Sequence, residues 1–164
     1  MNKSLLKLAL ILSLLASFGL ATAADDADSD VAKVVYHADF SDPRRFSAML
    51  TSINNMVTWY QDELTDYDIR IVFVAHGIRF LTDESLEGTP FATDAALEER
   101  RENLQGRLVS LNTVQNVKLE LCDITRSQIN LAEDKLYKGV EKVPSGVVRI
   151  AELQGQGFAY IKIE

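Results

Sequence analysis

Residues 117–122, Val-Lys-Leu-Glu-Leu-Cys, predict a short strand that ends on Cys122, the only cysteine of the chain. Two other short apolar runs, Val34–Tyr36 and Ile71–Ala75, end directly before His37 and His76, the only two histidines. Parallel strands place their carboxyl ends on one edge of a sheet, where open α/β proteins bind their ligands. We therefore expect His37, His76 and Cys122 to lie along a single edge.

Helical patterns separate these strands. Ser41-Asp42-Pro43 can cap and start a helix, and apolar residues then recur at helical spacing as far as Leu64. Asp94–Leu111 predicts a second long helix. A fourth strand at Val140–Val143, a helix from Pro144-Ser145-Gly146 through Leu153 and a last strand at Phe158–Ile163 complete the pattern. This alternation predicts an α/β fold with three layers, in which helices cover both faces of a five-stranded parallel sheet.

Two segments are less regular. Ile78–Thr93 predicts a long loop, and loops of this length usually cover a site or an interface. Its apolar residues, Phe80 and Phe91 among them, favour a position near the site or at a subunit contact. After Cys122, Thr125 can cap a short, broken helix that extends to Leu136.

The first residues have the pattern of a secretory signal peptide. Two lysines precede an apolar run at residues 8–20, and Ala21-Thr22-Ala23 matches a cleavage site. We expect a signal peptide at residues 1–23, a flexible acidic leader at 24–30 and one α/β domain at 31–164. The expected location is the periplasm, without a membrane anchor after cleavage.

The charge of the chain restricts its partners. Removal of Lys3 and Lys7 leaves 15 basic and 24 acidic residues, a net charge of −9. Such an acidic protein is a poor ligand for nucleic acid or an anionic membrane surface, so we expect small molecules or proteins as partners. No glycine-rich dinucleotide or phosphate-binding motif follows a strand, and no residues have the local spacing of metal ligands. We expect neither a nucleotide cofactor nor a metal.

A single cysteine cannot form a disulfide within the chain, so Cys122 is either buried and inert or a free thiol. A thiol reacts as its thiolate, which a helix N-terminus or a nearby cation stabilises. Arg126 in the following helix is a candidate cation, and His37 or His76 is a candidate base. Asp123 would oppose the formation of a thiolate.

Taken together, the predicted strand ends and the closing part of the chain resemble the DsrE/DsrF-like proteins. The resemblance rests on segments that span nearly all of the mature chain: Val34–His37 with Asp42-Pro43, Val74–Gly77, the strand ending in Cys122, Val140–Val148 and Ala151–Ile161. It implies a small α/β/α domain that forms oligomers, often trimers or hexamers. Some relatives carry sulfur as a persulfide on a cysteine at the end of the third strand, and Cys122 falls on that position.

Three classes of function remain open from the sequence. The first is a sulfur carrier or sulfurtransferase, in which Cys122 takes sulfane sulfur from a donor and passes it to an external thiol or an acceptor protein. The second is a module that binds a small ligand without chemistry. The third is a homo-oligomeric interaction protein. Accessibility of the Cys122 thiol distinguishes the first class from the other two.

Overall fold

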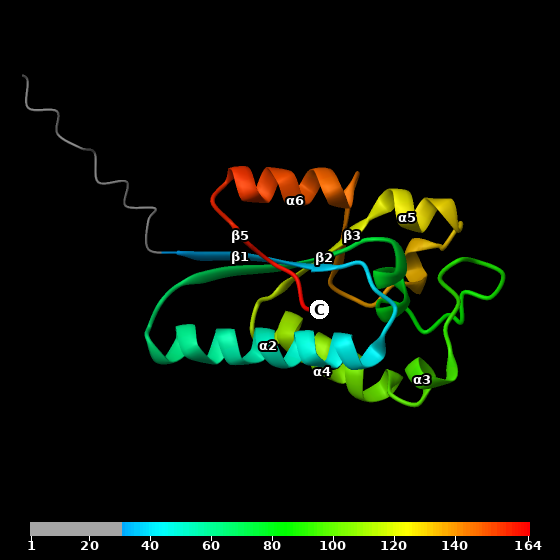
Figure 1. Cartoon of the computed structure of the whole chain (residues 1–164), viewed down its shortest axis with the longest axis horizontal. Coiled ribbons are helices and arrows are strands. Elements are labelled where there is room, and N and C mark those ends of the chain that lie inside the picture. The colour runs from blue at the N-terminus through cyan, green and yellow to red at the C-terminus, as the bar shows by residue number, and fades with distance from the viewer. Residues whose placement is uncertain (1–30) are drawn as a thin grey trace, which may run out of the picture.

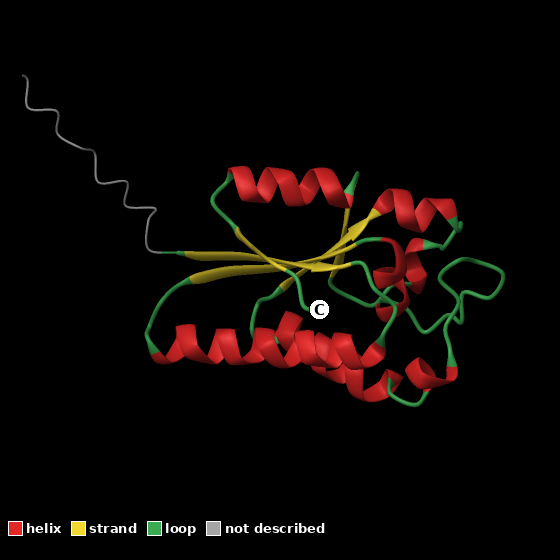
Figure 2. Ribbon diagram, in the orientation of Figure 1, coloured by secondary structure: helices red, strands yellow, loops and turns green. Residues whose placement is uncertain are grey.

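Five strands form one parallel sheet in the order β4-β3-β2-β1-β5 (Figures 1 and 2). The computed structural model describes residues 31–164, so the expected signal peptide and acidic leader lie outside the described residues. The strands are β1 (Ala32–Ala38), β2 (Tyr67–Phe73), β3 (Lys118–Cys122), β4 (Val140–Val143) and β5 (Ala159–Ile161). The predicted five-stranded parallel α/β architecture is confirmed.

The long helices cover the two faces of this sheet. Helices α2 (Pro43–Asp62) and α4 (Arg101–Thr113) lie on one face, and α6 (Gly146–Gly155) lies on the other (Figure 1). The start of α2 is as predicted, because the Asp42 side chain accepts a hydrogen bond from the Arg44 N–H at 2.7 Å and Pro43 is the first helical residue. Within residues 31–164, no helix is both long and apolar enough to cross a bilayer.

Alternate residues of the central strands fill two separate apolar cores. Val34 and Tyr36 of β1 belong to the larger core, which α2 and α4 cover, whereas Val35 packs with Ile150 and Leu153 of α6. Because both faces of the sheet are buried, its central strands are almost continuously apolar in sequence.

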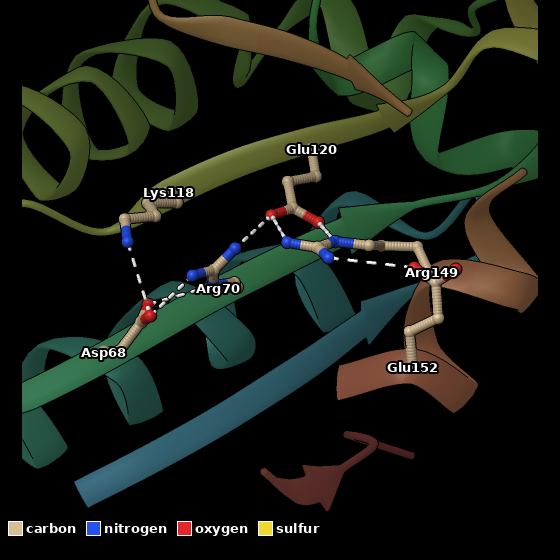
Figure 3. A network of polar contacts seen from close by, with 6 residues as sticks. All are labelled: Asp68, Arg70, Lys118, Glu120, Arg149 and Glu152. Atoms are coloured by element: carbon tan, nitrogen blue, oxygen red, sulfur yellow. Dashed lines mark hydrogen bonds and ion pairs between the residues drawn. The ribbon is translucent and has the colours of Figure 1, made fainter. Parts of the chain in front are cut away.

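One carboxylate interrupts this apolar pattern. Glu120 in β3 is 1% exposed and faces α6, where it accepts hydrogen bonds from Arg70 of β2 at 2.8 Å and from Arg149 of α6 at 2.7 and 2.9 Å (Figure 3). Arg70 also pairs with Asp68, at 2.6 Å. Burial alone would raise the pKa of Glu120, but the two guanidinium groups lower it below its usual range. This network ties three elements together across the smaller core.

The predicted helix at Asp94–Leu111 is wrong as a single element. The chain forms a short α3 (Ala95–Glu98) and a separate α4 that begins at Arg101. The Arg101 guanidinium binds the Glu98 carboxylate and also the Thr82 carbonyl, the latter at 2.5 Å. These contacts fix the preceding loop against the start of α4.

The predicted loop at Ile78–Thr93 is partly structured. A 3-10 helix, η1 (Ala75–Phe80), includes its first residues, and the side chains of Ile78, Phe80, Leu81 and Phe91 are buried within the chain itself. These apolar residues are therefore part of the core and do not form an exposed contact surface. Gly77 in η1 packs tightly under the end of β1, because a Cβ atom there would lie 2.1 Å from the Ala38 carbonyl oxygen.

Candidate functional site

The carboxyl edge of the sheet holds Cys122, His37 and His76, as expected from the sequence. Cys122 ends β3, His37 is the penultimate residue of β1, and His76 lies in η1, directly after β2. The connections that leave β1 and β2 lead to α2 and α4, whereas those that leave β3 and β4 lead to α5 (Asp123–Gln128) and α6 on the other face (Figure 1). The strand order β4-β3-β2-β1-β5 reverses between β1 and β5, and such a reversal is where open sheets bind ligands.

Two helices begin beside the Cys122 sulfur. Helix α5 starts at Asp123, two residues earlier than Thr125, where the sequence suggested a cap. Helix α6 starts at Gly146, beyond the neighbouring strand β4. The backbone N–H groups of Gly146, Thr125 and Ile124 and the Thr125 hydroxyl are close enough to the sulfur to stabilise its thiolate.

These donors change the acidity of the thiol. Cys122 is only 5% exposed, which is the burial expected of an inert thiol and not the exposure expected of a carrier, and this burial raises its pKa. The N–H groups of Gly146, Thr125 and Ile124, together with the Thr125 hydroxyl, outweigh burial and hold the pKa below the ordinary value for cysteine. The site thus favours a thiolate through backbone dipoles rather than through a side-chain cation.

Thr125 links this thiol to the end of β2. Its hydroxyl oxygen accepts a hydrogen bond from the Ala75 N–H at 3.1 Å, which leaves the hydroxyl hydrogen free to point at the sulfur. Ala75 has a left-handed backbone conformation, with φ of 50°. Non-glycine residues in this conformation are strained and are often found at functional sites.

Gly146 allows α6 to approach the thiol. A Cβ atom at this position would lie 2.5 Å from Cγ2 of Val74 and 3.0 Å from Cβ of Cys122. Glycine is therefore required if the first N–H of α6 is to reach the sulfur without displacing β2 or β3.

The sequence profile of the DsrE/DsrF-like family matches residues 15–163. The chain belongs to the DsrE/DsrF-like family. A solved structure of a protein of unknown function, MTH1491 from Methanobacterium thermoautotrophicum, is 26% identical and covers 80% of this chain and 98% of its own, with a TM-score of 0.60. The ychN protein from E. coli has the same fold at 19% identity, with 80% and 99% coverage and a TM-score of 0.52. No curated protein matches the chain.

In this DsrE/DsrF-like chain the other candidate residues have partners of their own. Arg126 donates to Asp123 and to the Leu131 carbonyl, both at 2.6 Å, and is not one of the groups that most strongly lower the Cys122 pKa. His76 packs edge-on against Phe91, with ring centroids 5.4 Å apart, and its buried Nδ1 has no hydrogen-bond partner. Within residues 31–164, no hydrogen bond or ion pair joins Arg126, His76 or His37 to the sulfur.

His37 instead faces the edge strand β5. Its Nδ1 lies 3.0 Å from the hydroxyl of Tyr160, and its Nε2 lies 3.9 Å from Asp39. Because β2 lies between β1 and β3, His37 and Cys122 are two strands apart, roughly 10 Å. The shared sheet edge therefore contains two distinct groups of polar residues. In the described part of the chain, no set of three or more His, Cys, Asp or Glu residues is arranged to hold a metal ion.

The sequence did not reveal the main residues around the thiol. Gly146 was assigned only as part of a helix start, and Thr125 only as a cap. The adjacency of β3 and β4 brings Gly146 to Cys122, and this adjacency depends on a strand order that local patterns do not encode. The only sequence signal for this contact was the segment Pro144-Ser145-Gly146, in which a glycine comes soon after the end of a predicted strand.

Proposed function

We propose that this protein is a sulfur carrier or sulfurtransferase that holds sulfane sulfur as a persulfide on Cys122. One observation supports the proposal above the others. The only thiol of the chain lies at the carboxyl edge of the sheet, between the N-termini of two helices whose N–H groups lower its pKa. Membership of the DsrE/DsrF-like family is consistent with sulfur relay at the level of the family.

The chemistry follows from a stabilised thiolate. The Cys122 thiolate attacks the terminal sulfur of a polysulfide, a new S–S bond forms, and the shortened polysulfide leaves with the electron pair of the broken bond. An external thiolate then attacks the outer sulfur of the persulfide, and Cys122 leaves as thiolate. A low pKa makes Cys122 a good leaving group in this second step.

The absence of a second cysteine determines the fate of the persulfide. Because Cys122 is the only cysteine in the chain, no internal thiol can resolve the persulfide as a disulfide within one subunit. The sulfur therefore passes to an external thiol or to an acceptor protein. This arrangement suits a carrier better than a redox sensor.

We also propose that the mature protein is exported to the periplasm and forms a homo-oligomer. The apolar run at residues 8–20 with its small-residue cleavage site supports export. The exposed apolar side chains of Ile124, Val147 and Val148, in the first turns of α5 and α6, support a protein contact near the thiol.

Sulfur uptake by the purified protein tests the proposed function. After incubation with polysulfide and removal of excess reagent, we expect the intact mass of the wild-type chain to increase by one sulfur atom. Cyanide should remove this sulfur as thiocyanate, and the Cys122→Ser variant should gain none. Uptake that is equal in wild type and Cys122→Ser, or absent in both, would contradict the carrier function.

A further inference from the structure

A second group of reactive side chains lies at the same sheet edge, between β1 and β5. Tyr160 of β5 is 40% exposed, whereas the side chain of its partner His37 is only 14% exposed. The Tyr160 hydroxyl and His37 Nδ1 are 3.0 Å apart, and the two rings are tilted by 57°. An accessible phenol is thus hydrogen-bonded to a mostly buried imidazole.

The other nitrogen of His37 indicates which tautomer is present. Nε2 is buried, has no hydrogen-bond partner and lies 3.9 Å from the carboxylate of Asp39. A hydrogen on Nε2 would face this negative charge, so we assign the proton to Nε2. Nδ1 then accepts the hydrogen bond that the Tyr160 hydroxyl donates.

The charges around the pair are mixed. Burial lowers the pKa of His37, the Asp39 carboxylate raises it, and Lys162 and Arg45 lower it, with a net decrease. The imidazole is therefore neutral near pH 7 and can accept a proton. Lys162 donates a hydrogen bond to Asp39 at 2.9 Å and also interacts with Tyr160, which places a positive charge beside the pair.

A nucleophile with a base at hydrogen-bonding distance is the core of a nucleophilic site, and a nearby carboxylate can stabilise the imidazolium that forms when the base takes the proton. We propose that Tyr160, His37 and Asp39 form such a site, in which the Tyr160 phenol attacks the carbonyl carbon of an activated acyl compound. The phenol oxygen forms an ester bond to that carbon, and the leaving group departs with its electron pair. The phenolic proton passes to His37 Nδ1 and then to the leaving group or to solvent.

This site is independent of the sulfur chemistry, and it can be tested in a Cys122→Ser background that removes the thiol. With p-nitrophenyl acetate as the probe, we expect a burst of one equivalent of p-nitrophenolate and an acetyl group on Tyr160 in peptide mapping. Tyr160→Phe should abolish the burst. Tyr137→Phe is the matched control and should retain it, because the Tyr137 hydroxyl donates to Asp83 at 2.7 Å and burial raises the pKa of Tyr137.

Two further variants test whether His37 accepts the proton of Tyr160 or only supports the local structure. His37→Asn keeps an acceptor near Nδ1 but cannot take a proton, so acetylation of Tyr160 should slow by about a hundredfold. Asp39→Asn removes the carboxylate that raises the His37 pKa, so the pH at which reactivity appears should move lower. Acetylation spread equally over lysines and other tyrosines, or equal rates for His37→Asn and its parent, would overturn the proposal.

Discussion

Replacing Glu120 by alanine is expected to lower the free energy of unfolding by about 3 kcal/mol, because it leaves two half-buried guanidinium groups without the carboxylate that they share. Glu120 is 1% exposed and binds both Arg70 and Arg149 (Figure 3). Arg70 retains Asp68, whereas Arg149 retains only the more distant Glu152, at 3.8 Å. Chemical unfolding in urea, followed by circular dichroism, measures the change.

Glu141 provides the matched control for this substitution. It lies opposite Glu120 in the register of β3 and β4 but is exposed. Glu141→Ala should change stability by no more than about 0.5 kcal/mol. Equal unfolding midpoints for the two variants would show that the buried network does not contribute to stability.

The same carboxylate predicts a pH dependence. The folded-state pKa of Glu120 lies below its ordinary value of 4.5, so its contribution to stability is complete above that pH and is lost as the pH falls through the folded pKa. The stability difference between wild type and Glu120→Gln should therefore shrink as the pH falls below 4.5. A difference that stays constant in this range would contradict the assigned ion pairs.

Gly146→Ala is expected to decrease the reactivity of Cys122 roughly tenfold near neutral pH, the effect of raising the thiol pKa by about one unit. The added Cβ atom would meet Val74 and Cys122 and push the N-terminus of α6 away from the sulfur. Overpacking of this kind also costs about 1–3 kcal/mol of stability. The rate of iodoacetamide alkylation of the folded variant measures the effect on the thiol.

Gly155→Ala is the control for this change, because Gly155 lies in the same helix and a Cβ atom there would have nothing within 4 Å. This variant should alkylate at the wild-type rate. If Gly146→Ala also retains that rate, the N–H group of Gly146 does not stabilise the thiolate.

The architecture of the domain could be predicted from local patterns because each long element carries its own signal. Asp42-Pro43 and the apolar spacing that follows specify α2, and the apolar runs before His37 and Cys122 specify strands buried on both faces. Alternation of strands and helices then implies a parallel sheet, which places the strand ends on one edge.

The partners of each site residue could not be predicted, because they depend on strand order. His37 contacts Tyr160 because β5 pairs with β1, and Gly146 reaches Cys122 because β4 pairs with β3. The sequence separation of these pairs gives no local signal. The ion pairs of Glu120 could not be predicted either. A single polar residue in a short strand usually faces solvent, but Glu120 faces Arg70 and Arg149.

The pH dependence of Cys122 alkylation in the native wild-type protein tests the central claim most directly. The N–H groups around the sulfur predict a rate profile whose midpoint lies below the value measured for the same cysteine in the unfolded chain. Peptide mapping should place the label on Cys122 under native conditions. A midpoint at or above that value, or a thiol that is labelled only after unfolding, would contradict the assignment of Cys122 as a thiolate poised to accept sulfur.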